Sequence, residues 1–209
     1  MNLERIKSVL PDYAKDLRLN LESVLSEGGA PGLSQKQIAL VALASAIASR
    51  HAPLTEAITQ FASQHVDEKE LDGARTAAAL MGMTNIYYRF LHLVENDEYG
   101  TLRAGLRMNA MANPGCDKVD FDLASVAVSA INGCGSCVAS HERTLRKHDV
   151  PAQAVQSAAR IAAVIHAVAV VLGEAMPLAD ALNGIGCIAE RPTQDAEGGV
   201  AWRAQDARA

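Results

Sequence analysis

The sequence predicts an all-α protein, and three observations support this prediction. Of the 209 residues, 38 are alanine and only 4% are aromatic. Alanine is the strongest helix former, whereas aromatic residues favour strands. Apolar residues recur at three- and four-residue intervals, which is the period of an amphipathic helix. Collagen-like and disordered classes are excluded, because 49% of the residues are hydrophobic and there are only 15 glycines and 7 prolines.

The first part of the chain predicts a series of helices separated by clear breaks. Apolar spacing indicates a helix over residues 3–25, with a break at Pro11, and a glycine-rich loop follows at 28–32. Ser34 and Gln37 form a capping-box pattern, so the next helix is expected to run from 35 to about 50. Pro53 suits the first turn of another helix. Residues 67–85 and 85–94 are each expected to be helical.

The second part repeats this style of organisation after a turn at 112–115. Asp120 is expected to cap a helix over 121–131, which Asn132 and Gly133 interrupt. A further helix is expected from Cys134 to about residue 148, and Pro151 opens a long one that reaches about 175. Beyond a break at residue 177 and a short apolar piece, the polar sequence from 190 onward predicts a loosely ordered end.

A sequence similarity between two segments that lie 84 residues apart suggests a duplicated helical unit. The sequence Ala-Ser-Ala-Ile at 44–47 matches Val-Ser-Ala-Ile at 128–131. Both halves read as helix, helix and long alanine-rich helix. We therefore expect one all-α domain over 1–178, with halves at about 1–94 and 102–178, followed by an extension over 179–209. Arg50 and Pro53 occupy the first-half positions that correspond to Cys134 and Cys137.

Charge and hydropathy predict a cytoplasmic protein that binds neither nucleic acid nor membrane. The net charge is −5, and no basic stripe with interleaved aromatic residues occurs. The first residues carry charges and no apolar segment of the signal-peptide kind. The longest apolar run, 161–172, is shorter than the roughly 20 residues that a membrane span needs.

The four cysteines include one closely spaced pair, Cys134 and Cys137. On a helix, this pair and His141 lie at positions i, i+3 and i+7, and therefore share one face. Cys134 is expected near the helix start, where free N–H groups and the helix dipole favour a thiolate. Gly133 and Gly135 keep the surroundings small, so that a substrate or partner sulfur can approach.

A carboxylate is expected to join this group. If the helices on either side of Asn132 and Gly133 form an antiparallel hairpin, Asp122 lies level with residues 141–143. An acid, an imidazole and two thiols would then converge, which is the arrangement needed to move protons onto and off sulfur.

Each of these residues also has an alternative interpretation. The two cysteines with His141 and Asp122 would supply four zinc ligands, although structural zinc sites usually use a second Cys or His pair. His141 alone could be a surface residue, and Asp122 a first-turn helix charge. The remaining candidates are assigned to packing or to no role: Cys116 and Cys187 as incidental thiols, Met81, Met83, Tyr87 and Tyr88 as core or interface residues, and His166 as a core histidine that is less often a pocket residue.

The motif, taken together, resembles that of a known family. Residues 129–142 read Ser-Ala-Ile-Asn-Gly-Cys-x-x-Cys-x-x-x-His-Glu, and residues 79–90 and 102–109 carry further matching stretches. These segments resemble the alkyl hydroperoxide reductase D (AhpD-like) family, in the carboxymuconolactone decarboxylase-like superfamily. The resemblance covers about residues 1–178, and the extended motif is far more specific than the bare cysteine pair.

This resemblance implies a fold, an activity and partners. It implies an all-α fold with a duplicated unit, a homotrimer and no bound cofactor or metal. It implies an antioxidant thiol peroxidase that reduces alkyl hydroperoxides and H₂O₂. Electrons would come from dihydrolipoamide on a lipoyl-bearing 2-oxoacid dehydrogenase component, kept reduced by dihydrolipoamide dehydrogenase. The family also passes electrons to a two-cysteine peroxiredoxin of the AhpC type.

The resemblance also implies residue roles. Cys137 would become the sulfenic acid, Cys134 would be the proton donor and resolving thiol, and the two would form the redox disulfide. His141 and Asp122 would relay protons. The helix-terminus argument above favours Cys134 as the stronger thiolate, but a base beside a thiol can outweigh the dipole.

The chain departs from the family pattern at three places. Asp122 stands where the family typically has Glu, so its reach is shorter by about 1.5 Å, a gap that a bridging water can close. Ser136 stands where some members have His, which removes a second imidazole near the thiolate. The extension beyond about residue 177 has no counterpart.

Two rival functions remain open from the sequence. A general dithiol–disulfide oxidoreductase would use the same thiols and ignore peroxides, and a non-catalytic zinc-binding module would use them as ligands. Muconolactone decarboxylases share a related fold but need no vicinal cysteines, so the cysteine pair argues against that activity.

Overall fold

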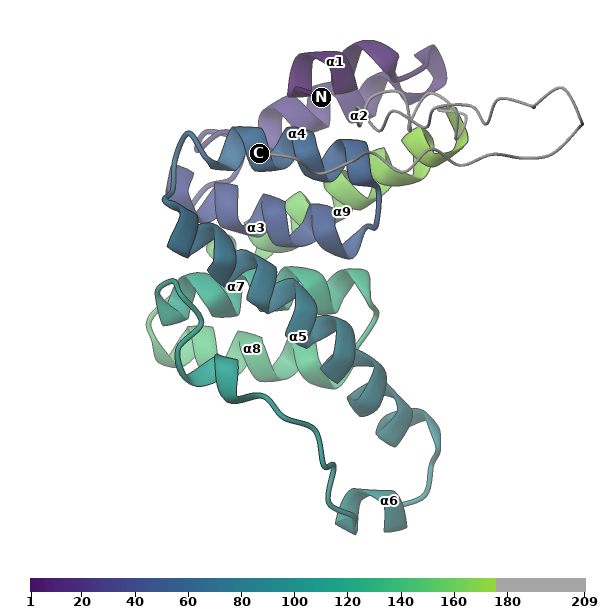
Figure 1. The fold of residues 1–209 in the computed structure, drawn as a ribbon, viewed down its shortest axis with the longest axis vertical. Helices are drawn as coiled ribbons and strands as arrows, with labels where there is room; N and C mark the ends of the chain where they lie inside the picture. The colour runs from purple at the N-terminus through teal and green to yellow at the C-terminus, as the bar shows by residue number, and fades with distance from the viewer. Residues whose placement is uncertain (176–209) are drawn as a thin grey trace, which may run out of the picture.

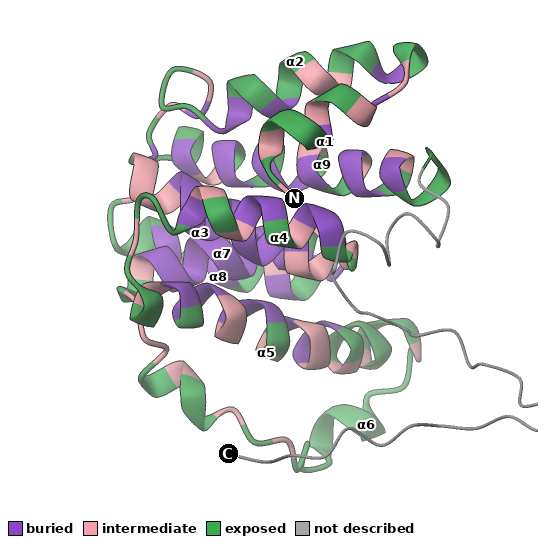
Figure 2. Ribbon diagram, turned by 45° about the horizontal axis from the view of Figure 1, so that its top comes forward, coloured by how far each residue is buried: buried purple, intermediate pink, exposed green. Residues whose placement is uncertain are grey.

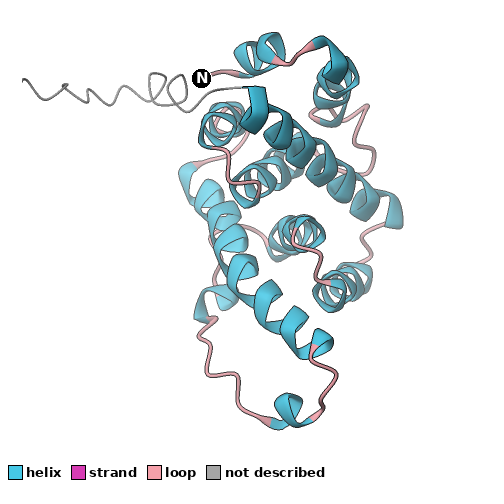
Figure 3. Ribbon diagram, turned by 90° about the vertical axis from the view of Figure 1, so that its right-hand side faces the viewer, coloured by secondary structure: helices cyan, strands magenta, loops and turns pink. Residues whose placement is uncertain are grey.

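The structure, a computed structural model, describes residues 1–175, and the regular structure in this part of the chain is all helical (Figures 1 and 3). The all-α prediction is therefore confirmed over these residues. In chain order the elements are α1 (Leu3–Val9), η1 (Asp12–Ala14), α2 (Lys15–Val24), α3 (Gln35–Ala48), α4 (Ala52–Ala62), α5 (Glu68–Leu93), α6 (Glu98–Thr101), η2 (Asn109–Ala112), α7 (Lys118–Ile131), α8 (Gly135–Lys147) and α9 (Ala152–Ala175). The predicted extension over 179–209, with Cys187, lies outside the described residues.

Local capping residues set most helix starts where the sequence predicted them. The Ser34–Gln37 capping box begins α3, and Pro53 lies in the first turn of α4. The break at Pro11 separates α1 from η1 and α2. Residues 67–94 form one helix, α5, rather than two, and it begins with a capping box between Asp67 and Glu70.

The predicted cap at Asp120 is wrong. Asp117 caps α7 by accepting from the Val119 backbone N–H, and the helix begins three residues earlier than expected. Asp120 is instead buried, accepts a hydrogen bond from Gln37 Nε2 at 2.9 Å and pairs with Lys36 Nζ at 3.3 Å. The local pattern assigned this side chain to capping, but it makes tertiary contacts with α3 instead.

The internal repeat is present in the helix positions. The starts of α3, α4 and α5 at 35, 52 and 68 correspond to those of α7, α8 and α9 at 118, 135 and 152, an offset of 83 or 84 residues. The long helix of each half, α5 or α9, packs against both α3 and α7. The two halves are therefore interleaved rather than side by side. The finer domain limits remain a prediction.

The core lies around α3 and α7, which are buried on every side over residues 38–46 and 120–129 (Figure 2). A helix that is buried all round must sit at the centre of the bundle. Many of these residues are alanine, so neighbouring helices can approach closely. This explains how a chain with so few aromatic residues forms a continuous core.

The segment 94–117, which we call the arm, leaves the bundle at the end of α5, extends away from it around α6, and returns to pack against it at Met111 and Cys116 (Figure 1). It carries α6 and η2 and connects the free end of α5 to α7. Several large apolar side chains are exposed on the arm and on the adjoining end of α5: Ile86, Tyr88, Phe90, Leu93, Tyr99 and Leu102.

Helix α9 is long and apolar enough to cross a bilayer when judged by length and composition alone. A core helix of a globular protein meets the same criteria, so this is weak evidence for a span. The buried face of α9 packs against α2, α3 and α7, which accounts for its apolar character.

The junction between α7 and α8 is a tight helix stop. Gly133 adopts a left-handed conformation with φ of 67°, and its N–H bonds to the Ala130 carbonyl. The N–H of Cys134 bonds to the Ser129 carbonyl, which completes a Schellman motif. Cys134 is also the N-cap of α8, so one residue ends the first helix and starts the second.

We expect Gly133→Ala to lower the free energy of unfolding by about 1 kcal/mol, the cost of a Cβ in the left-handed region. The added atom would have space, since its nearest neighbour is Arg89 Nη1 at 3.9 Å, so the loss would be conformational. Urea denaturation of the reduced protein measures it. Gly135→Ala is the matched control and should be neutral or stabilising, because Gly135 is helical and has nothing within 4 Å. Equal losses in both variants would contradict this explanation.

Candidate functional site

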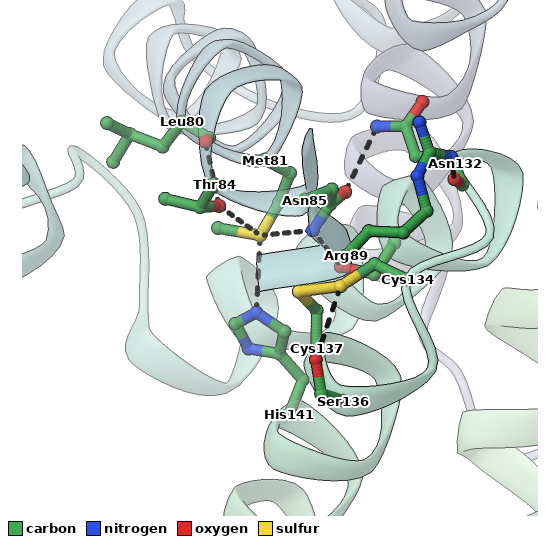
Figure 4. Close-up of a disulfide and its surroundings, with 11 residues drawn as sticks. Leu80, Met81, Thr84, Asn85, Arg89, Asn132, Cys134, Ser136, Cys137 and His141 are labelled. Carbon is green, nitrogen blue, oxygen red and sulfur yellow. Dashed lines mark hydrogen bonds between the residues drawn. A yellow bond between two sulfur atoms is a disulfide. The ribbon is translucent and has the colours of Figure 1, made fainter. Parts of the chain in front are cut away.

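The site is built around the α7–α8 hairpin, where Cys134 and Cys137 are joined by a disulfide. Cys134 is the N-cap of α8 and Cys137 lies in its first turn, with 5.3 Å between their Cα atoms (Figure 4). Both are buried, yet unequally: Cys134 is 1% exposed and Cys137 is 7% exposed. The vicinal spacing therefore gives a pair that can cycle between dithiol and disulfide.

His141 lies one turn beyond Cys137 on α8 and meets Asp122 from α7. The distance from His141 Nδ1 to Asp122 Oδ1 is 2.9 Å, and both side chains are buried. The antiparallel hairpin thus places the carboxylate opposite the imidazole, as the sequence argument predicted. The contact is direct, so no bridging water is needed between these two groups despite the shorter aspartate.

The second oxygen of Asp122 is less well satisfied. Its Oδ2 lies 3.7 Å from Lys118 Nζ, one turn away on α7, and has no hydrogen-bond partner in the described part of the chain. Lys118 is largely exposed, so this ion pair is weak. The carboxylate therefore interacts mainly with His141. This hydrogen bond orients the imidazole ring and favours a proton on Nδ1.

Met81 from α5 contacts the other ring nitrogen. Its sulfur lies 3.3 Å from His141 Nε2 (Figure 4). The sequence assigned Met81 to packing; the side chain is buried as expected, but it also belongs to the site. With Nδ1–H donated to Asp122, Nε2 donates to the thioether only when the ring is an imidazolium. The thioether is a weak acceptor, so it leaves Nε2 available for other partners.

Helix α5 also holds the turn that carries Cys134. Asn85 donates to Ser129 Oγ and accepts from Asn132 Nδ2, each at 3.0 Å. Arg89, one turn further, donates to the Asn132 carbonyl (Figure 4). We call these contacts of Asn85 and Arg89 with the turn the clamp, and the sequence analysis did not predict them. The available signal was the four-residue spacing of Met81, Asn85 and Arg89, which puts them on one face of α5.

A pocket of about 430 Å³ opens onto Cys137. Its lining comes from three segments: α5, the arm and α8. Of the two cysteines, Cys137 is part of this lining and Cys134 is not. The lining residues are Met81, Thr84, Tyr88, Met108, Met111, Ser136, Cys137, Ser140, His141 and Arg143.

The other candidates from the sequence lie elsewhere. Cys116 is a free, half-buried thiol packed against Gly73, and burial together with the charge of Asp120 raises its pKa to about 11. It is almost wholly protonated at neutral pH and is no second nucleophile. The expectation that His166 is a core residue is wrong: it is exposed on α9 and contacts Ser49 Oγ at 3.3 Å. Ser136 is exposed, with its Oγ 3.5 Å from Cys134 Sγ.

No group of three or more His, Cys, Asp or Glu side chains within residues 1–175 is arranged to hold a metal ion.

Comparison with known proteins gives a consistent result. The sequence model of the carboxymuconolactone decarboxylase family matches residues 97–181, which include the redox motif. A curated protein from Frankia alni, named alkyl hydroperoxide reductase AhpD, is 50% identical over 185 residues, covering 88% of this chain and 98% of that protein. Proteins of the same name from Bradyrhizobium and Coxiella burnetii are 50% and 53% identical, covering 86% and 80% of this chain and 99% and 94% of the relatives.

We expect Asn85→Leu to lower the free energy of unfolding by about 2 kcal/mol, since it leaves the buried Ser129 Oγ and the part-buried Asn132 Nδ2 without their partner. Chemical denaturation of the reduced protein measures the change. Thr84→Val is the control on the same helix, because the Thr84 hydroxyl bonds the Leu80 carbonyl within its own helix and should matter less. If the two variants lost equal stability, the clamp would have no special importance.

Proposed function

The chain belongs to the alkyl hydroperoxide reductase AhpD family, and on that basis we propose that it is an antioxidant thiol peroxidase that reduces alkyl hydroperoxides, and H₂O₂, at Cys137. The observation that carries the proposal is the disulfide-forming pair, of which Cys137 lines the pocket, with the buried His141–Asp122 pair one turn away.

The first step is attack on the peroxide by Cys137. The thiolate sulfur bonds to one oxygen of R–O–O–H, the O–O bond breaks, and the departing alkoxide takes a proton to leave as an alcohol. Cys137 is then a sulfenic acid. Cys137 lines the pocket, whereas Cys134 does not and is more deeply buried, and this supports the role for Cys137.

The second step closes the disulfide. The Cys134 sulfur attacks the sulfenic sulfur of Cys137, an S–S bond forms and water leaves. Only a short movement is needed, since Cys134 is already held by both helices and lies one turn from Cys137. The fixed position of the resolving thiol favours rapid closure before a second peroxide can oxidise the sulfenic acid further.

His141 and Asp122 are proposed to relay the protons of both steps. Asp122 holds Nδ1–H of the ring, so Nε2 is the nitrogen that exchanges protons with the thiols or the leaving oxygen. The pair is almost closed to solvent, which strengthens the interaction between the carboxylate and the imidazole.

The reductant is proposed to be dihydrolipoamide, carried by a lipoyl-bearing 2-oxoacid dehydrogenase component and regenerated by dihydrolipoamide dehydrogenase. A dithiol entering the pocket meets Cys137 first, forms a mixed disulfide there and then closes its own ring, which releases both protein thiols. We also propose that the reduced pair passes electrons to an AhpC-type two-cysteine peroxiredoxin. The cycle uses no bound cofactor and suits a cytoplasmic location, where such reductants are kept reduced.

We propose a homotrimer as the working form. The support is the number of large apolar side chains exposed on the arm and the end of α5, where Phe90 and Tyr99 contact one another, because exposed apolar groups that gather in one region usually mark an interface.

The central test is peroxide turnover with purified protein, cumene hydroperoxide or H₂O₂, and dihydrolipoamide supplied through lipoamide, dihydrolipoamide dehydrogenase and NADH. We expect Cys137→Ser to abolish turnover. Cys116→Ser is the matched control and should retain full activity, because that thiol is half-buried, has a raised pKa and does not line the pocket. Full activity of Cys137→Ser would overturn the assignment of the nucleophile.

Companion variants in the same assay separate the remaining roles. Cys134→Ser should still consume one peroxide per chain but fail to turn over. His141→Phe should slow the reaction and change its pH profile, and an unchanged rate at every pH would refute the relay. Efficient reduction of protein disulfides with no peroxide turnover would favour the general oxidoreductase. About one zinc per chain in metal analysis, with unfolding on chelation, would favour the zinc module.

The oligomer is tested by light scattering during gel filtration. We expect the wild type at three times the 22.1 kDa mass of one chain, and Leu93→Glu at a lower mass, because a buried unpaired charge opposes association. Leu19→Glu is the control: Leu19 is 66% exposed on α2, as Leu93 is 67% exposed, but α2 lies at the other end of the molecule (Figure 1). A wild-type monomer, or dissociation by Leu19→Glu alone, would contradict the proposed interface.

A further inference from the structure

The pocket over Cys137 has a markedly apolar wall. Met81, Tyr88, Met108 and Met111 bring thioether and aromatic groups to it from α5 and the arm. A volume of about 430 Å³ is far larger than H₂O₂ requires and falls within the range of pockets that hold small organic molecules. Apolar substrate surface buried against this wall gains binding free energy that H₂O₂ has no means to gain.

The pocket lining contains one Lys, Arg, Asp or Glu side chain, and that is Arg143. It is exposed, and within residues 1–175 it has no carboxylate within 4.0 Å and no hydrogen bond. Arg146, one turn along α8, is by contrast already engaged, with Glu142 at 3.9 Å and the Val150 carbonyl at 2.7 Å. Arg143 therefore lines the pocket with a guanidinium that no side chain of residues 1–175 pairs with.

From these features we infer that the preferred substrates are organic hydroperoxides with an apolar body and a carboxylate, the chemistry of hydroperoxides of unsaturated fatty acids. The inference rests on the proposed peroxidase function and adds the substrate class. The guanidinium pairs with the carboxylate through two parallel N–H donors, while the apolar body lies along the methionine and tyrosine wall.

The positions on α8 fix how such a substrate lies. Arg143 follows Cys137 by six residues, which is about 9 Å along a helix axis. The peroxide group therefore reaches the Cys137 sulfur when it is several carbons away from the carboxylate. The chemical step is unchanged: sulfur gains one oxygen, the O–O bond breaks, and a hydroxy acid leaves.

The test compares linoleic acid hydroperoxide with its methyl ester, and uses cumene hydroperoxide and H₂O₂ as references. Pre-reduced protein is mixed with each hydroperoxide below its micelle concentration, and loss of peroxide is followed in a single turnover, so that no reductant is involved. The acid should react faster than the ester in the wild type. In Arg143→Gln the ratio of acid to ester rate constants should fall about fivefold, the size of a well-formed exposed ion pair.

Arg146→Gln is the matched control, since it removes an arginine from the same helix without touching the pocket, and it should leave that ratio unchanged. An acid that reacts no faster than the ester in the wild type would overturn the inference alone. The inference would also be overturned if Arg143→Gln lowered the rate constants of all four peroxides equally, because Arg143 would then act on the reactivity of the thiol and not on the substrate carboxylate. If no hydroperoxide oxidised the thiols, the proposed function would fail as well.

Discussion

The junction at Asn132, Gly133 and Cys134 is the constraint on which the rest of the site depends. A left-handed glycine ends α7, and the next residue both closes that helix and caps α8. Cys134 is thereby held by two helices at once. Because α8 starts there, Cys137 and His141 follow at one-turn intervals, and the reversal of direction brings Asp122 on α7 opposite His141. One tight turn thus sets the positions of all four proposed functional groups.

The junction alone is insufficient, however, since it is held from outside by the first half of the chain. All four groups lie in the second repeat, yet the long helix of the first repeat supplies Asn85 and Arg89, which bond the turn, and Met81, which contacts the imidazole. The interleaving of the halves makes this possible, because α5 packs against both α3 and α7. His51 is the N-cap of α4 as Cys134 is the N-cap of α8, so His51 and Leu54 stand at the positions equivalent to the two cysteines. The sequence match to Arg50 and Pro53 is therefore one residue off, since Arg50 corresponds to Gly133 and shares its positive φ. The first repeat has no cysteine and serves as the support of the second.

Local chemistry made much of this predictable from sequence. The capping box at Ser34, the cysteine spacing and the hairpin argument for Asp122 depend on neighbours within about twenty residues. Pairs such as Asn85 with Ser129, or Met81 with His141, join residues 44 and 60 positions apart, and only packing decides them. The same reason explains the errors. Asp120 does not cap α7 as expected, because its carboxylate bonds Gln37 and Lys36 on α3. His166 lies on the exposed face of α9, a helix whose other faces are apolar.

The shorter carboxylate shows how backbone position and side-chain length compensate one another. Asp122 is one methylene shorter than a glutamate, yet it meets His141 Nδ1 directly at 2.9 Å across the packed α7–α8 pair. The imidazole is therefore fixed firmly at Nδ1 and only weakly at Nε2, where its neighbour is a thioether. In the disulfide form no strong hydrogen bond holds Nε2 in place. Nε2 is thus the ring nitrogen left to exchange protons in the proposed relay.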